Sequence, residues 1–155
     1  MNGIETLNIA STVTANTLTL ADNGHETVNV TGTRALDLTL AGTTIETVNA
    51  SALTGALTLT LGAGATDISV TGGSGNDIVN VTAANIDEND VIVGGNGTDV
   101  LATNAAITAA NATGISGFEQ IEITSAANQA ANAFSGILQA NVFDNALIFS
   151  GPQVR

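Results

Sequence analysis

The sequence predicts an all-β fold, a parallel β-solenoid with two short strands in each turn of about 20 residues. The first observation is a Glu-Thr-aliphatic-Asn unit that begins at Glu5, Glu26 and Glu46, and so recurs at a nearly constant step. The second is an aliphatic-polar-aliphatic unit that recurs between these at Leu18–Leu20, Leu38–Leu40, Leu59–Leu61 and Val79–Val81. The third is strict apolar-polar alternation between glycine-containing turns, which is typical of strands.

Alternation assigns the side chains of each strand to two faces, because neighbouring residues in a strand point to opposite sides. In the first kind of strand we expect two inward columns: Leu7, Val28, Val48 and Ile68, and Ile9, Val30, Ala50 and Val70. In the second kind we expect Leu18, Leu38, Leu59 and Val79, and Leu20, Leu40, Leu61 and Val81. The outward columns are Thr6, Thr27 and Thr47, Asn8, Asn29 and Asn49, and Thr19, Thr39, Thr60 and Asn80. Burial of the inward ladders, at about 25 cal/mol per Å², is then the main stabilising term.

Two other fold classes are weighed against the solenoid. A helical fold disagrees with the alternation of runs such as 56–61. An all-β sandwich also gives short strands at a regular spacing. The in-phase recurrence of the Glu-Thr unit favours the solenoid, in which each turn buries its apolar side only against its neighbours.

The length of 155 residues predicts one domain. Residues 1–103 form the solenoid, and residues 104–155 are an irregular continuation or a C-terminal cap of the same domain. Within the second part, 104–112 predicts a loop, and 115–123 restores the repeat, with Glu119, Ile121 and Ile123 in the places of Glu5, Leu7 and Ile9. The alanine-rich stretch 128–140 predicts a short helix or an irregular turn. The phenylalanines, Phe118, Phe134, Phe143 and Phe149, suit a cap or an edge that packs on a further piece of chain.

Composition excludes several classes of protein. The formal net charge is −12, with no lysine and only Arg34 and Arg155 as bases, so nucleic-acid binding and adsorption to anionic membranes are not expected. There is no cysteine, and no apolar run is long enough to insert into a membrane. No secretory signal of the basic and apolar kind is visible, and Met1 directly precedes a strand-like run, so we expect a fragment of a longer chain.

Two glycine-aspartate turns of one design stand out. They read GGSGNDIVN at 72–80 and GGNGTDVLA at 94–102, so the second follows the first by one turn of the repeat. We therefore expect them as stacked neighbours on one edge of the solenoid. Glycine lets backbone carbonyls converge, and aspartate adds a hard anionic oxygen of the kind that Ca²⁺ prefers.

Both turns fit G-G-x-G-x-D-x-U-x, and thereby resemble the RTX family of calcium-binding β-rolls. The resemblance implies a right-handed roll and an ion between successive turns. By position, the implied ligands are Gly73, Gly75 and Asp77 of one turn with Gly94, Asn96 and Asp99 of the next. The turn here is longer than the family's, with the extra residues in 82–89 on the opposite side.

The flanking units look similar to the calcium-dependent surface-layer (S-layer) proteins of Gram-negative bacteria, the Caulobacter type. That resemblance implies a structural, non-enzymatic domain of a secreted protein at the bacterial cell surface, exported by type I secretion, in which Ca²⁺ drives folding and assembly. The expected partners are other copies in a lattice or neighbouring domains of a longer chain, with cell-surface polysaccharide as a further candidate. Nucleic acid and membrane insertion are not expected.

The acidic residues allow other interpretations as well. Asp77 and Asp99 could instead cap their turns through their side chains. The acidic stretch 87–90 is either a solvated loop or a second ion site, and the column of Glu5, Glu26 and Glu46 either splays into water or binds cations.

Other functions are an RTX adhesin, an ice-binding threonine face, or the non-catalytic β-roll of an exported protease or lipase. His25 is the only histidine, so no nucleophile-base pair or histidine-rich metal site is expected, and we predict no enzyme activity.

Overall fold

The computed structural model describes residues 5–21, 24–41, 44–62, 67–82, 86–104 and 106–124 with their side chains. It also describes the backbone of 127–130, 139–142 and 147–150. All regular secondary structure in these ranges is β-strand, as the sequence predicts. In the described part of the chain we find no helix that could cross a membrane.

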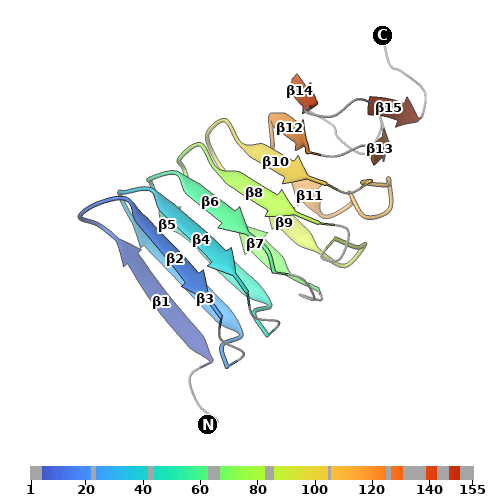
Figure 1. Ribbon diagram of the computed structural model, residues 1–155. Coiled ribbons are helices and arrows are strands. Elements are labelled where there is room, and N and C mark those ends of the chain that lie inside the picture. The colour runs from blue at the N-terminus through green and yellow to red at the C-terminus, as the bar shows by residue number, and fades with distance from the viewer. Residues whose placement is uncertain are drawn as a thin grey trace.

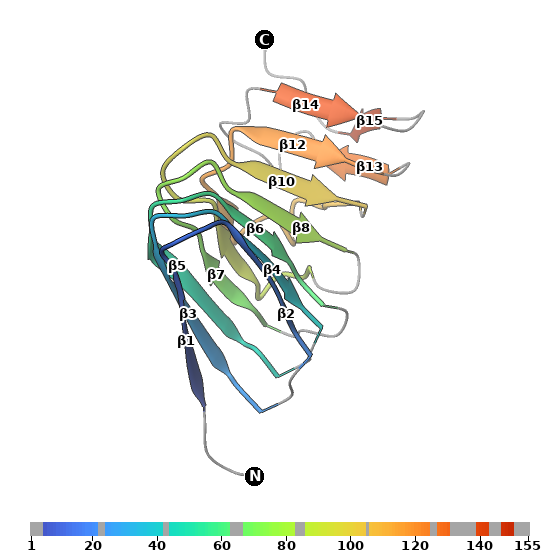
Figure 2. The ribbon, with the colours of Figure 1, turned by 60° about the vertical axis from the view of Figure 1, so that its left-hand side comes forward.

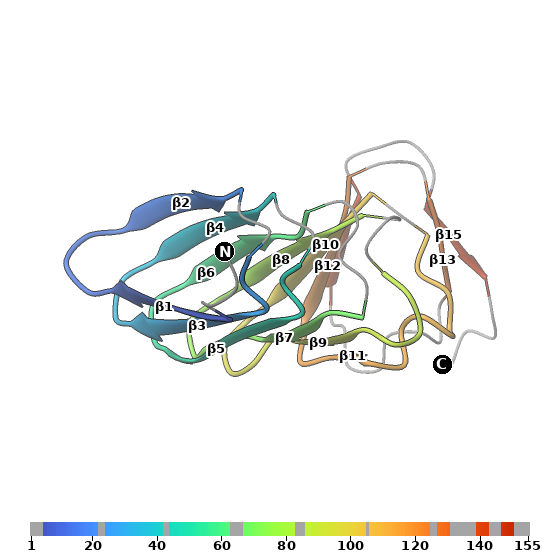
Figure 3. The same ribbon diagram turned by 90° about the horizontal axis from the view of Figure 1, so that it is seen from below.

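The strands form two parallel sheets that face each other (Figures 1 and 3). The first sheet contains β1 (Thr6–Ser11), β3 (Thr27–Gly32), β5 (Thr47–Leu53), β7 (Ser69–Thr71), β9 (Val91–Val93) and β11 (Ile115–Ser116). The second contains β2 (Asn16–Leu20), β4 (Leu36–Leu40), β6 (Leu57–Thr60), β8 (Ile78–Val81), β10 (Val100–Thr103), β12 (Gln120–Ile123) and β14 (Gln139–Val142).

Consecutive strands alternate between the sheets, so each pair makes one turn of a solenoid. Paired residues on neighbouring turns are 19 to 23 positions apart in the sequence. In Figure 1 the nearer sheet runs down to the right and the farther one up to the left, while the turns advance to the right. The coil is therefore right-handed, the hand that parallel crossovers almost always take.

The second sheet has the predicted register. Leu18, Leu38, Leu59 and Val79 form one continuous column of paired residues. The outward column of Thr19, Thr39, Thr60 and Asn80 is likewise in register. The side chains of Leu38, Leu59 and Val79 are completely buried, which confirms that this column faces the core.

In the first sheet two predicted pairings are wrong, Val48 with Ile68 and Ala50 with Val70. Val48 pairs with Val70, and not with Ile68, so the column continues from Leu7 and Val28 through Val70 to Ile92. A separate shift of one residue interrupts the pairing of β3 with β5 between Asn29 and Thr31. A shift of two residues keeps the same side chains on the inner face. Ile68 and Val70 are therefore both buried, and alternation alone cannot distinguish the two registers.

The two sheets continue beyond residue 103. β11 extends the first sheet and β12 the second, so Ile121 pairs with Leu101. The predicted placement of Ile121 and Ile123 on the strand of Leu7 and Ile9 is therefore wrong, since those residues belong to β1 in the other sheet. Strands of the two sheets have the same apolar-polar alternation, so the sequence pattern does not show to which sheet a strand belongs.

At the C-terminal end, β14 pairs with β12, while β13 (Ala127–Ala130) and β15 (Leu147–Ser150) form a separate two-stranded sheet (Figure 2). The two ends of the alanine-rich stretch are thus strands, and its middle, 131–138, lies outside the described residues. Phe118 is buried in the core. The side chains of Phe134, Phe143 and Phe149 lie outside the described part, so the predicted aromatic cap stays a prediction.

Candidate metal centre

The two glycine-aspartate turns are stacked neighbours, as their spacing predicts. Each connects a strand of the first sheet to a strand of the second, β7 to β8 and β9 to β10. Ile78 pairs with Val100 at the ends of the turns, and the backbone N–H of Asn96 donates to the carbonyl of Gly73 at 3.0 Å. The turns therefore pack directly on one another along one edge.

Asp77 is completely buried and holds two turns together. Its Oδ1 accepts a hydrogen bond from the backbone N–H of Leu57, one turn earlier, at 2.8 Å. Its Oδ2 accepts one from the N–H of Gly73, within its own turn, at 2.7 Å. The capping alternative weighed from the sequence describes these contacts, since both oxygens satisfy buried backbone donors.

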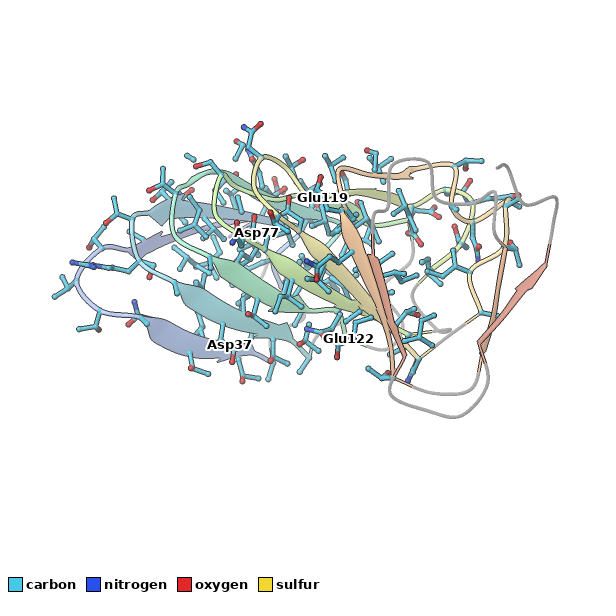
Figure 4. The ribbon with its side chains drawn as sticks, turned by 90° about the horizontal axis from the view of Figure 1, so that it is seen from above. Asp37, Asp77, Glu119 and Glu122 are labelled. Carbon is cyan, nitrogen blue, oxygen red and sulfur yellow. The ribbon has the colours of Figure 1, made fainter. Side chains whose placement is uncertain are left out.

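Asp99 repeats the first of these contacts one turn later. It is also completely buried, and its Oδ1 accepts the N–H of Asp77 at 2.8 Å. The N–H of Asp99 in turn donates to Oε2 of Glu119 at 2.8 Å. We call the series Leu57, Asp77, Asp99 and Glu119 the acid ladder, because each acid accepts the N–H of the residue one turn before it. In Figure 4, Asp77 and Glu119 lie near this edge, whereas Asp37 and Glu122 lie on the outer side of the second sheet.

Burial raises the pKa of both aspartates. For Asp77 the loss of water around the carboxylate outweighs the hydrogen bonds from Leu57 and Gly73, which lower its pKa. For Asp99 burial is again the largest cause, the N–H of Asp77 opposes it, and the charges of Asp77 and Glu119 raise the pKa further. A buried carboxylate with acidic neighbours is stabilised in its charged form by a cation.

The predicted carbonyl ligands lie at close approaches between turns. A Cβ on Gly97 would lie 2.2 Å from the carbonyl oxygen of Gly75, and a Cβ on Gly72 would lie 1.7 Å from that of Gly94. Gly95 and Gly97 also take φ of 115° and 136°, a region that L side chains rarely adopt. Glycine is thus required at these places for the backbones to meet.

The fit of this set of residues to Ca²⁺ depends on its donor atoms. The donor atoms are all oxygen, which suits the ion. Among the described residues no three His, Cys, Asp or Glu side chains gather as a metal-binding group, so a cation here would depend on backbone carbonyls as well. Each oxygen of Asp77 already accepts one backbone N–H, but Oδ2 of Asp99 is buried and has no hydrogen-bond partner. That orphaned oxygen fits a cation.

Of the six predicted ligands, the structure thus brings Asp77 and Asp99 into direct contact through the backbone of Asp77. The carbonyl of Gly73 accepts a hydrogen bond from the next turn, and Asn96 is exposed at the tip of its turn. Their roles as metal ligands stay predictions. Where Ca²⁺ binds, it supplies positive charge to an edge whose described carboxylates have no basic side chain beside them.

The other acidic candidates are arranged differently. In the stretch 87–90, Asp87 and Glu88 are exposed, beside a shallow depression that Thr108 and Asn111 also line. Asp90 is instead buried, with Oδ1 accepting the N–H of Ile68 at 2.9 Å and Oδ2 that of Asp87 at 2.6 Å. Burial raises the pKa of Asp90.

The glutamate column is stacked at the surface. The N–H of Glu26 donates to the carbonyl of Glu5, and that of Glu46 to the carbonyl of Glu26, so the three are stacked. All three side chains are exposed. They can therefore spread into water, where their mutual repulsion is small.

Sequence reasoning missed the structural role of two acidic residues. Glu119 was assigned to the glutamate column, although it follows Asp99 by one turn of the repeat and so continues the series of Asp77 and Asp99. Asp90 was grouped with Asp87 and Glu88 as part of a solvated loop or a second ion site, although it directly precedes the strand β9. In both cases, spacing by one solenoid turn from a known inward position was the available signal.

Comparison with protein-family models, with curated proteins and with solved structures finds no match for this chain.

Proposed function

We propose that this chain is a calcium-dependent structural domain of a secreted cell-surface protein, a surface-layer lattice subunit or a fragment of one. The observation that carries the proposal is Oδ2 of Asp99, a fully buried carboxylate oxygen without a donor, within a stack of glycine turns. The resemblance of both turns to the RTX repeat and the net charge of −12 support the same cation.

The proposed mechanism is linkage between ion binding and folding. Without Ca²⁺, burial of Asp77 and Asp99 opposes the compact state, because each carboxylate must lose water or keep a proton. Millimolar Ca²⁺, as found outside cells, supplies the missing charge, so that binding free energy becomes folding free energy. A chain that stays unfolded inside the cell and folds outside is suited to type I secretion.

The proposal assigns a structural role and no catalysis. The chain has a single histidine and no cysteine, which leaves few of the usual nucleophile-base pairs.

The proposed partners of the domain are other copies in a lattice or neighbouring domains of a longer chain. In support, β1 and β2 lie at the free edges of their sheets, and Leu7, Ile9, Leu18 and Leu20 are only partly buried there. Cell-surface polysaccharide is a further candidate partner.

Thermal melting followed by far-UV circular dichroism tests the proposal, since the chain has no Trp or Tyr for fluorescence. We expect β structure and a raised melting temperature in millimolar Ca²⁺, and less of both in EGTA. Mg²⁺ at the same concentration controls for ionic strength and should stabilise much less, because it requires a smaller, octahedral site. Equal spectra and melting temperatures in Ca²⁺ and EGTA would rule the proposal out.

A second candidate function is ice binding. Thr19, Thr39 and Thr60 are in register on the outer face of the second sheet, about 4.8 Å apart, which gives a short regular array of hydroxyls. Asp37 interrupts the parallel column between Thr17 and Thr58. Thermal hysteresis at micromolar protein would support ice binding, and its absence would exclude it.

The two other candidates, an RTX adhesin and the β-roll of an exported protease or lipase, share the calcium mechanism. They differ only in the chain to which the domain is attached.

A further inference from the structure

The two aspartates of the stacked turns differ in one hydrogen bond. Oδ2 of Asp77 accepts from the N–H of Gly73, but the equivalent oxygen of Asp99 has no partner, although Gly95 is the residue equivalent to Gly73. Gly95 takes a positive φ of 115°, and Gly73 does not. The second turn therefore has another backbone shape, and it leaves a charged oxygen without a donor in a fully buried side chain.

A backbone carbonyl lies beside that oxygen. The carbonyl oxygen of Gly117 and Oδ2 of Asp99 lie 1.9 and 2.9 Å from the point where a Cβ on Gly94 would stand. Their separation is therefore no more than about 4.8 Å, the sum of the two distances. We find no donor to the Gly117 carbonyl among the described residues. Two adjacent acceptors without a donor repel each other unless a cation or a proton lies between them.

Glu119 adds a second carboxylate to the same place. One of its oxygens, Oε2, accepts the N–H of Asp99, and no hydrogen bond to the other is found in the described part of the chain. Its charge is close enough to Asp99 to oppose ionisation of that side chain. The first turn has a corresponding pair, the carbonyl of Gly94 and Oδ2 of Asp77, but there Oδ2 already accepts the N–H of Gly73.

We propose that Asp99, Glu119 and the carbonyl of Gly117 hold one Ca²⁺, on the far side of the second glycine turn and not between Asp77 and Asp99. Opposite ligands of one Ca²⁺ are about 4.6–5.2 Å apart, twice the usual Ca–O distance of about 2.3–2.6 Å. The gap between the Asp99 and Gly117 oxygens is within this range or below it. Water completes the coordination, since Glu119 is only half-buried. This inference rests on the proposed function and names a ligand, Glu119, in a turn that lacks the glycine-aspartate motif.

Calorimetric titration of Ca²⁺ into the metal-free protein tests the inference with matched variants. Glu119→Gln removes the charge but keeps an oxygen that can accept the N–H of Asp99. Glu122→Gln removes a charge from the outer face of β12, three residues away, and is the control. We expect Glu119→Gln to weaken calcium binding at least tenfold and Glu122→Gln to leave it within twofold.

Carbon-13 NMR of the side-chain carboxyl groups in the unaltered protein gives a second readout that needs no variant to fold. Saturation with Ca²⁺ should move the signals of Asp99 and Glu119 and leave that of Glu122 in place. Unchanged affinity in Glu119→Gln, or a shift centred on Asp77 with Glu119 unmoved, would overturn the inference and leave the proposed function standing. Absence of any calcium binding to the unaltered protein would overturn both.

Discussion

The backbone N–H of Asp77 donates a hydrogen bond of 2.8 Å to Oδ1 of Asp99, which lies one turn later and directly over it in the stack. The same relation joins Leu57 to Asp77 and Asp99 to Glu119. The strands of the second sheet begin at this edge, and the acids accept the N–H groups of Leu57, Asp77 and Asp99 there. The edge that resembles a calcium site is thus also a continuous structural ladder.

The ladder predicts that Asp77→Ala is destabilising even without calcium. The substitution leaves the buried N–H groups of Leu57 and Gly73 without acceptors. Each unsatisfied donor costs about 1–3 kcal/mol. Urea unfolding in EGTA measures the loss. Asp37→Ala, an exposed acid on β4, is the control and should change stability by about 0.5 kcal/mol or less. Equal stability of the two variants would contradict the ladder.

Glycine is predicted to be essential where turns meet. Gly72→Ala places a Cβ 1.7 Å from the carbonyl oxygen of Gly94, so the two turns must separate. We expect a loss of about 1–3 kcal/mol, the usual range for overpacking. Ser74→Ala, at an exposed position of the same turn, serves as the control in thermal melting. Equal melting temperatures of the Gly72→Ala and Ser74→Ala variants would show that the two turns are not in contact.

Sequence alone predicted most of the fold and only part of the site. The columns of the second sheet follow from strict alternation and a constant step, so Leu18, Leu38 and Leu59 were placed correctly. The pairing of Val48 was not, because β7 pairs with β5 two residues further along the chain than the constant step predicts, and a shift of two residues keeps the same side chains on the inner face. Alternation carries no information about such a shift.

For the site, the motif identified the stacked turns but not how their atoms are used. The hydrogen bond from the N–H of Leu57 to Asp77 depends on how the preceding turn packs against this one. The motif itself does not specify that packing. Glu119 was overlooked as a member of the ladder because its turn does not match the glycine-aspartate motif. The free oxygen of Asp99 follows from the backbone shape at Gly95, which no residue pattern specifies.

The buried core predicts a large effect for Leu59→Ala. This side chain is completely buried between its column neighbours Leu38 and Val79. Truncation of a buried leucine usually costs about 2–5 kcal/mol. Val13 is 81% exposed, so Val13→Ala should hardly change the free energy of unfolding. It is the control for removing apolar side-chain atoms at the surface. Chemical denaturation of both variants measures the difference, and similar midpoints would contradict the assigned core.

The raised pKa values of Asp77, Asp90 and Asp99 predict a pH dependence in calcium-free buffer. Each pKa is higher in the folded chain than its ordinary value of 3.8, so the folded state binds more protons than the unfolded one above that pH. The stability contributed by these groups is therefore complete below 3.8 and is lost as pH rises through their folded pKa values.

Melting temperatures measured from pH 3.8 upward in EGTA should reveal this decline. Asp90→Asn should make it shallower, since one of the three groups no longer titrates, whereas Asp37→Asn should leave its slope unchanged. A melting temperature that rises over the same interval in both variants and in the unaltered protein would reverse the predicted sign.

Linkage between calcium and folding is the central claim, and the free energy of unfolding as a function of free Ca²⁺ tests it most directly. Urea unfolding at a series of buffered calcium concentrations gives this curve. Binding to the folded state alone predicts a rise of about 1.4 kcal/mol per bound ion for each tenfold increase in Ca²⁺ above the dissociation constant. A free energy of unfolding that stays constant from EGTA to millimolar Ca²⁺ would contradict the claim.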